Sequence, residues 1–193
     1  FVLAALLLAV SLSFAGCTSS TTVPEPAGTE QVAGELAASI TNGLTDLKTG
    51  IANNSRTLAA SGLTGPEAEA VLRENLLAFP WAYSSLVISP EGIVVAAVPK
   101  NYAGVVGKDL SWQPETQKAN TDRAPVTSGV FLMAEGFTGI SQSYPVFSAS
   151  GEYLGYTDIT YAPETFLAHH IDPVISGTGY DAWVTQTDGT VIY

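Results

Sequence analysis

Apolar residues recur at helical spacing over the first part of the chain that is able to fold. They follow one another at three- and four-residue steps, with one seven-residue step at the end, and they are Val32, Leu36, Ile40, Leu44, Leu47, Ile51 and Leu58. This spacing predicts a long amphipathic helix over about residues 30–60. Gly34, Gly43 and Gly50 each weaken a helix by up to about 1 kcal/mol relative to alanine. Packing of the apolar face must therefore hold it.

A second, shorter helix is expected directly after the first. Thr64 and Glu67 have the spacing of a capping box, and Pro66 lies where the first turn would begin. Proline does not continue a helix, so the second helix should end near Ala78, before Pro80.

From residue 83 the apolar pattern changes from helical to alternating. Five runs are rich in β-branched and aromatic residues, and they are residues 83–88, 93–98, 128–133, 139–147 and 153–161. Ser89–Gly92 has the composition of a tight turn and makes the first two runs a hairpin. Residues 99–125 are broken by prolines and glycines and hold at most a short helix. The pattern predicts an antiparallel five-stranded meander after the helices, an α+β fold, followed by a helix over residues 163–174.

The beginning of the sequence is an apolar segment of a different kind. Residues 1–16 are too few to span a hydrocarbon core, which needs about 20 residues, but they suit the hydrophobic region of a signal peptide. The segment ends in Ala15, Gly16 and Cys17, which resembles a lipobox, the site at which a lipoprotein receives its lipid. We expect Cys17 to carry a lipid. An ordinary cleaved signal or a short anchor helix remains the alternative.

Composition and charge restrict the classes of molecule that the chain is expected to bind. Residues 18–29 are small, polar and proline-containing, as in a flexible tether. With 46% hydrophobic residues, the rest of the chain has enough apolar surface for a core. The net charge of −11 lies entirely after Cys17 and argues against binding to nucleic acid or anionic lipid.

The end of the chain repeats an earlier pattern. Residues 183–192 echo residues 86–95 as two β-runs joined by an acid-glycine turn. A hairpin alone is marginally stable, so we expect these residues to begin a second module that continues beyond Tyr193. The lack of an initiator methionine or a basic segment before Phe1 likewise leads us to expect an earlier natural start.

The order of these features resembles the Cache family of extracellular sensory domains. It consists of a long helix, a short helix and an acid-glycine hairpin, followed by residues 107–111 (GKDLS), 144–146 (YPV) and 151–155 (GEYLG). The resemblance implies a PAS-like sheet in a membrane-distal module over residues 30–168. It also implies a double Cache arrangement, in which residues 169–193 are a linker and the first hairpin of a second, truncated module.

The resemblance further implies a small-molecule pocket between the sheet and the irregular segment. The candidate ligand-binding residues are Tyr83, Trp112, Arg123, Tyr144 and Asp158. Strand alternation is taken to let Tyr144 and Asp158 face the same side. Asp158 is the sharpest candidate, because a carboxylate in an apolar strand must be exposed, paired or bound to a ligand amine. Asp158 and Arg123 on the surface, and Trp112 in the core, remain alternatives.

The kind of ligand is less well indicated. Amino-acid-binding Cache domains carry an Arg-x-Trp-Tyr cluster, of which residues 110–113 keep only Trp112. The resemblance therefore does not extend to an amino-acid ligand.

No chemistry of catalysis or metal binding is indicated. The sequence has no Gly-x-Ser-x-Gly pattern and no glycine-rich phosphate loop, and the adjacent His169 and His170 would point about 100° apart on a helix. We therefore expect no enzyme, no cofactor and no metal site.

The expected function is that of a sensor. We expect an extracytoplasmic, membrane-anchored lipoprotein of a prokaryote whose Cache-type domain binds a small molecule and reports it to a membrane signalling partner. Two alternatives stay open. One is a lipoprotein that captures a ligand for a transport partner, and the other is a structural cell-surface spacer without a ligand.

Overall fold

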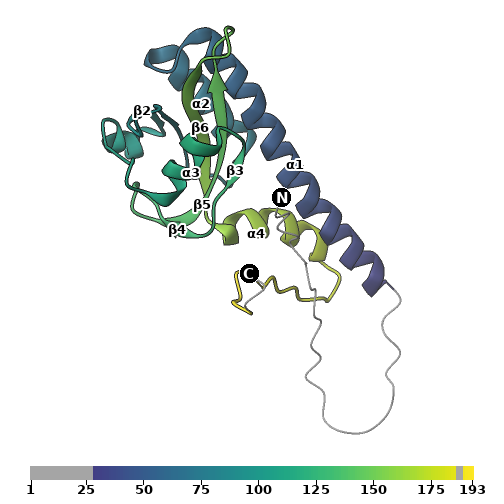
Figure 1. Cartoon of the computed structure of the whole chain (residues 1–193). Helices are drawn as coiled ribbons and strands as arrows, with labels where there is room; N and C mark the ends of the chain where they lie inside the picture. Colours follow the sequence, from purple (N-terminus) through teal and green to yellow (C-terminus); the bar gives the residue numbers. More distant parts are fainter. Residues whose placement is uncertain (1–27, 186–188) are drawn as a thin grey trace, which may run out of the picture. The chain divides into compact units, whose positions relative to one another are not determined.

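The computed structural model of the chain describes residues 28–185 and 189–193 (Figure 1). Cys17 with its lipobox, most of the expected tether and the tip of the C-terminal hairpin lie outside the described residues. The chain forms two compact units. Thr45–Phe166 is called the sheet unit here, and the described residues 28–44, 167–185 and 189–193 form the second unit.

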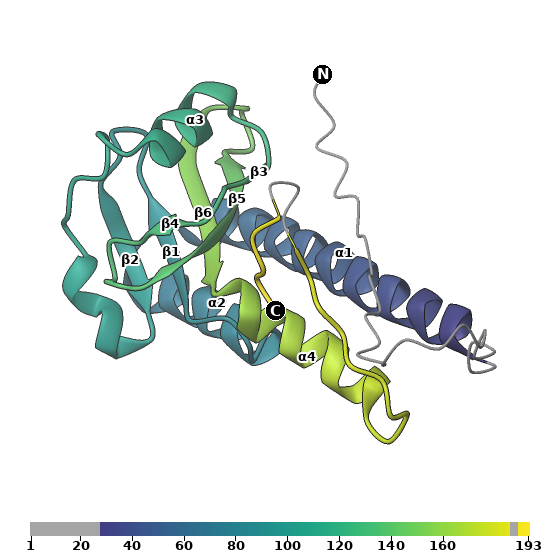
Figure 2. The same cartoon turned by 90° about the horizontal axis from the view of Figure 1, so that it is seen from below.

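The sheet unit contains one antiparallel sheet between helices. Its elements are the end of α1 (Thr29–Ser61), α2 (Gly65–Ala78), β1 (Ser84–Ile88), β2 (Val94–Val98), η1 (Lys100–Val105), α3 (Pro114–Asp122), β3 (Val126–Thr127), β4 (Phe131–Leu132), β5 (Thr138–Phe147), β6 (Tyr153–Tyr161) and the start of α4 (Pro163–Ile175). The strand order is β2-β1-β6-β5-β3, with β4 also pairing with β5 (Figure 2). The long helix followed by an antiparallel sheet confirms the expected α+β class.

The third expected strand divides into two. Instead of one strand over residues 128–133, β3 and β4 are two-residue strands that both pair with β5. Gly129 lies between them, where a residue without a side chain weakens a strand. The sheet therefore has six strands, not five.

Helices α1 and α2 cover one face of the sheet. Alternate residues of the strands, including Val87, Val98 and Val146, pack against Leu58 of α1 and Leu72 of α2. These side chains are at most 3% exposed. Burying one such side chain stabilises a fold by about 1.5–3 kcal/mol. The packing of this layer therefore offsets the loss of helix propensity at the glycines of α1.

The opposite face is covered by the segment between β2 and β3. Leu110 packs on Leu86 and Ile88 of β1. The amide of Leu110 also donates to the carbonyl of Gly92 at 2.8 Å. A Cβ on Gly92 would lie 2.8 Å from the backbone of Ser111, and its φ is +86°. The glycine of the hairpin turn thus lets the covering segment approach the sheet.

The start of α2 differs from the capping box that the sequence suggests. Thr64 is the N-cap residue and Pro66 lies in the first turn, as expected, but the Thr64 side chain makes no capping hydrogen bond. Helix α2 begins at the expected place and is held there by packing of Ala68 and Val71.

The second unit joins the beginning of α1 to the end of α4. Ser39 Oγ donates to the carbonyl of His170 at 2.9 Å. A Cβ on Gly43 would lie 2.3 Å from the His170 ring, so glycine permits this close helix packing. No helix among the described residues is both long and apolar enough to cross a membrane.

The expected C-terminal hairpin is paired at its base. The amide of Ile192 donates to the carbonyl of Val184 at 2.9 Å, and Thr185 pairs with Val191 in an antiparallel bridge. Residues 186–188 at the tip lie outside the described residues. The second module that this hairpin was expected to open stays a prediction.

Candidate functional site

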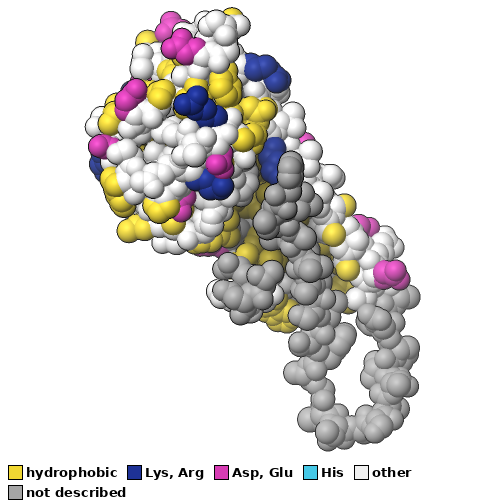
Figure 3. Space-filling view, viewed as in Figure 1, with side chains coloured by type: hydrophobic (Ala, Val, Ile, Leu, Met, Phe, Trp, Pro, Cys, Tyr) yellow, Lys and Arg dark blue, Asp and Glu magenta, His cyan; other side chains and the backbone are white. Residues whose placement is uncertain are grey.

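The surface of the sheet unit offers no concentrated charge on the face shown in Figure 3. There, Lys and Arg side chains lie singly among Asp and Glu side chains. Within the described residues there is also no group of three or more His, Cys, Asp or Glu side chains able to hold a metal ion. The candidate binding site is therefore expected in a cavity.

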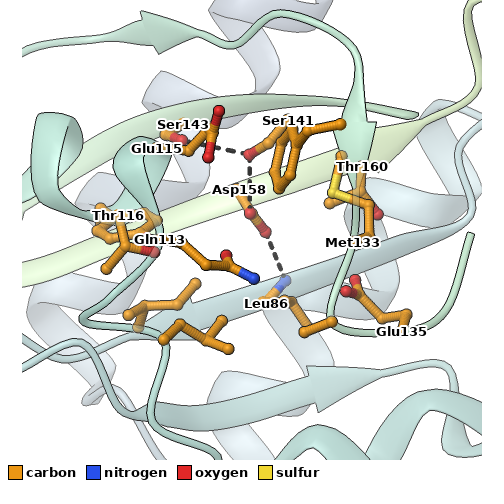
Figure 4. A pocket seen from close by; sticks show the side chains of 15 residues that line it. Leu86, Gln113, Glu115, Thr116, Met133, Glu135, Ser141, Ser143, Asp158 and Thr160 are labelled. Atoms are coloured by element: carbon orange, nitrogen blue, oxygen red, sulfur yellow. Dashed lines mark hydrogen bonds between the residues drawn. The ribbon is translucent and has the colours of Figure 1, made fainter. Parts of the chain in front are cut away.

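A small pocket lies between the sheet and the segments that cover it (Figure 4). It is lined by Leu86, Ile88, Leu110, Gln113, Glu115, Thr116, Phe131, Met133, Ala134, Glu135, Ser141, Ser143, Tyr156, Asp158 and Thr160. The floor comes from β1, β5 and β6, and the walls come from the start of α3 and the turn after β4. The cavity measures about 20 Å³, which is room for about one water molecule.

Asp158 lies in the floor of this pocket on the central strand β6. It is 5% exposed. One carboxyl oxygen, Oδ1, accepts a hydrogen bond from the amide of Leu86 at 3.1 Å, and Oδ2 accepts one from Ser141 Oγ at 2.9 Å. Burial, with the charge of Glu135 as a second cause, raises the pKa of Asp158 to about 8. Two hydrogen bonds do not compensate for the loss of water, so the carboxyl group is held protonated near neutral pH.

Two further acids line the pocket. Glu135 accepts a hydrogen bond from Ser84 Oγ at 2.6 Å, and Glu115 lies in the first turn of α3. Lys, Arg and His are absent from the lining. The nearby cation Lys108 is exposed and does not line the pocket itself, but its Nζ donates to the carbonyl of the lining residue Ala134 at 3.2 Å. The lining itself is therefore acidic, and the one nearby cation, Lys108, lies at its exposed edge.

Gln113 is a polar side chain in the pocket wall. It is 7% exposed, and its amide group points into the pocket (Figure 4). Its side chain makes no hydrogen bond to any of the described residues, whereas nearby Thr116 bonds to the Tyr156 hydroxyl at 3.0 Å. The amide group borders the pocket rather than protein atoms. The amide of Gln113 is thus available to a molecule in the pocket.

The expectation that Tyr144 and Asp158 face the same side is wrong. Asp158 pairs with Ser143, and Tyr144 pairs with Thr157 on the opposite face. The pairing shifts between Val146 and the residue after it, and a shift of one residue exchanges the two faces of a strand. The alternation within each strand is as expected, but the register between the strands is not.

Tyr144 instead lines an open groove between α1 and β5. The groove measures about 370 Å³ and is bordered by Ala52, Ser55, Arg56, Ala59, Ala60, Pro145, Phe147, Ser148 and Ala149. One lining residue of the groove, Ser55, has a buried hydroxyl group that donates to the carbonyl of Pro145 at 2.6 Å. The groove is larger than the pocket, and its polar side chains are Ser55, Arg56, Tyr144 and Ser148.

The other three candidates do not line the pocket either. Tyr83 packs edge-on against Phe137, with ring centroids 4.8 Å apart. Trp112 is 69% exposed, and Arg123 lies at the end of α3 with its guanidinium group 4.9 Å from the ring of Tyr153. Of the five candidate ligand-binding residues, the structure brings only Asp158 to this pocket. Whether any of them binds a ligand stays a prediction.

Sequence reasoning missed most of the polar lining. Ser141 and Ser143 alternate along β5 just as Tyr156, Asp158 and Thr160 alternate along β6. That alternation could have identified the polar lining, but only if the register between β5 and β6 had been known. Gln113 and Glu135 lie in loop and helix-start positions, where no periodic pattern marks a side chain as buried.

Solved structures of sensor domains have the same fold. An extracellular ligand-binding receptor from Desulfohalobium retbaense is 28% identical, with a TM-score of 0.74, and the match covers 86% of this chain and 31% of that one. The chain thus spans about a third of that receptor. The ligand-binding domain of the Pseudomonas aeruginosa amino acid chemoreceptor PctC, solved with GABA, is 18% identical with a TM-score of 0.55, covering 84% of this chain and 72% of that one.

A histidine kinase sensor domain has the fold as well. The sensor domain of Vibrio cholerae DctB is 15% identical with a TM-score of 0.53, covering 71% of this chain and 55% of that one. No curated protein matches the chain. These structures confirm the expected PAS-like, Cache-type sensor fold.

A family model places the chain by sequence. The model described as "HK/GC/Chemotaxis protein-like, sensor domain" matches residues 42–163, which is more than half of the chain. The matched region contains the sheet, the covering segment and the pocket. The chain therefore belongs to the HK/GC/chemotaxis protein-like sensor domain family.

Proposed function

We propose that the chain is an extracytoplasmic sensor that binds a small-molecule ligand in the pocket between the sheet and α3 and reports it to a partner in the membrane. The proposal rests first on membership of a sensor domain family. The relatives with the same fold include a receptor and a chemoreceptor domain that bind ligands outside the cell. We further propose that the chain has no catalytic activity of its own and is anchored by a lipid on Cys17.

The observation that carries the proposal is the polar interior of the pocket. Asp158 and Gln113 are both more than nine-tenths buried, yet the Gln113 amide has no partner among the described residues. Side chains that are this deeply buried are usually apolar, yet the Gln113 amide group faces the pocket. A ligand that pairs with these groups supplies the reason for their presence.

The size of the cavity favours a second candidate function, that of a spacer without a ligand. About 20 Å³ is too little for any organic molecule. Ligand binding therefore requires the covering segment to move away from the sheet. The turn after β4 suits such a movement, because Glu135 is half-buried and Gly136 is exposed. The two candidates differ in whether any small molecule stabilises the protein.

A thermal-shift screen of amines, amino acids and small carboxylates against the purified protein tests the proposal. We expect at least one class to raise the melting temperature, because a ligand that binds only the folded state stabilises it. Calorimetry with the best compound should then show that Gln113→Ala binds more weakly by about 1 kcal/mol, the value of one hydrogen bond.

Gln117→Ala is the matched control. Gln117 lies on α3, four residues after the N-cap residue Gln113, is exposed, and donates to the carbonyl of Ser111 at 3.0 Å outside the pocket. This variant should bind like the wild type. A screen in which no compound stabilises the protein would support the spacer. Equal weakening of binding by both variants would contradict binding in this pocket.

A further inference from the structure

The charges around the pocket restrict the ligand that it accepts. Three of the lining side chains are acids, Glu115, Glu135 and Asp158, and none is Lys, Arg or His. Because the Asp158 carboxyl group is held protonated, a ligand carboxylate would meet the negative charges of Glu115 and Glu135, with no cation among the lining side chains. Like charges at close range in a poorly hydrated site repel each other strongly. The lining thus disfavours carboxylic acids, and it disfavours amino acids through their carboxylate.

The polar groups of the pocket suit an ammonium group. An alkylammonium group has three N–H donors and no acceptor. Asp158 and Glu135 supply carboxyl oxygens, and Gln113 supplies an amide oxygen without a partner among the described residues. These three side chains come from β6, the turn after β4 and the start of α3, and all of them line the same cavity. Together they match the number and kind of donors on the ligand.

Part of the remaining wall is apolar and suits an alkyl chain, beside the hydroxyl groups of Thr116, Ser141, Ser143, Tyr156 and Thr160. Leu86, Ile88 and Leu110 are buried and belong to one apolar cluster, and Met133 is 4% exposed. These side chains offer no hydrogen bond to a second polar group of a ligand. An aliphatic chain attached to the ammonium group would bury apolar surface against them.

We propose that the pocket selects a small alkylamine that carries no carboxylate group, with its ammonium group bound by Asp158 and Glu135. This inference rests on the proposed sensor function and specifies its ligand class. The unpartnered, buried amide of Gln113 points to a ligand independently of the three acids.

Binding of an ammonium group should release a proton. Burial raises the pKa of Asp158 to about 8, so this carboxyl group is largely protonated at pH 6. An adjacent cation favours the carboxylate form. The amine keeps its own proton, and the proton of the Asp158 carboxyl group passes to the buffer. Glu135, Glu115 and Tyr156 are the other titratable groups in the lining.

Calorimetry with a matched pair of compounds tests the proposal. Isobutylamine and valine differ only by the carboxylate. At pH 6 we expect the purified protein to bind isobutylamine at least tenfold more tightly than valine. Titrations in two buffers of different ionisation enthalpy should show release of about one proton per amine bound.

The Asp158→Asn variant isolates the role of the carboxyl group. It preserves the shape of the side chain, and we expect it to bind isobutylamine at least tenfold more weakly without releasing a proton. Glu152→Gln is the control, because Glu152 is an exposed acid away from the pocket. It should bind and release protons like the wild type.

Other outcomes separate this inference from the sensor function. Valine binding as tightly as isobutylamine would overturn the selection against carboxylates. If that binding still weakens in Gln113→Ala, the pocket and the sensor function stand. Failure of isobutylamine to bind, or binding without proton release, would overturn the proposed ammonium site. The broader compound screen then decides separately whether the pocket binds anything.

Discussion

A single buried carboxyl group, that of Asp158, links the stability of the sheet unit to pH. Its folded-state pKa is raised to about 8, above the value near 3.9 of an unfolded aspartate. The folded state therefore binds the proton more tightly than the unfolded state. The stability that this provides is fully present below about pH 4 and is lost as the pH rises through about 8.

The corresponding prediction concerns Asp158→Asn. The free energy of unfolding of the wild type should fall between pH 4 and pH 8 relative to that of the variant, because asparagine has no proton to lose. Denaturant unfolding at several pH values measures this difference. Glu152→Gln, which changes an exposed acid, should follow the wild type. Parallel pH profiles for the wild type and Asp158→Asn would show that Asp158 is ionised in the folded protein.

Among the elements, two helices and a strand meet at one buried amide. Asn75 of α2 is fully buried. It donates to Ser85 Oγ of β1 at 2.9 Å and accepts a hydrogen bond from Asn54 of α1. A side-chain network of this kind fixes how the helices lie on the sheet.

Replacement of Asn75 should destabilise the sheet unit. Asn75→Ala removes both hydrogen bonds from the partly buried Asn54 and the buried Ser85, so we expect a loss of about 1–3 kcal/mol. Glu74→Ala, at the adjacent exposed position, should change the unfolding free energy by less than about 0.5 kcal/mol. Urea unfolding of the two variants gives the comparison. Equal stability of both would mean that the network contributes nothing.

The elements themselves were predictable from local spacing, whereas the site was not. The apolar residues of α1 and the β-runs around Ser89–Gly92 carry their periods in the sequence. The placement of Tyr144 depended on the register between β5 and β6, which is set by a turn and an irregularity near Val146. The burial of Gln113 depends on tertiary packing, and no local pattern records it.

For the whole molecule, attachment to a membrane stays a prediction. The apolar segment that ends in Ala15, Gly16 and Cys17 predicts export and lipidation at Cys17. Expression of the full-length gene with a labelled fatty acid should label the wild type and leave Cys17→Ser unlabelled. Equal labelling of the two proteins would refute lipidation at this residue.

The central claim is that a small molecule binds between the sheet and α3. A crystal structure of the protein with the compound that stabilises it most tests this claim directly. We expect the ligand to contact Asp158 and Gln113, with the turn after β4 displaced outward to make room. A ligand in the groove beside Tyr144, or elsewhere on the outer surface, with the pocket still closed, would contradict the account.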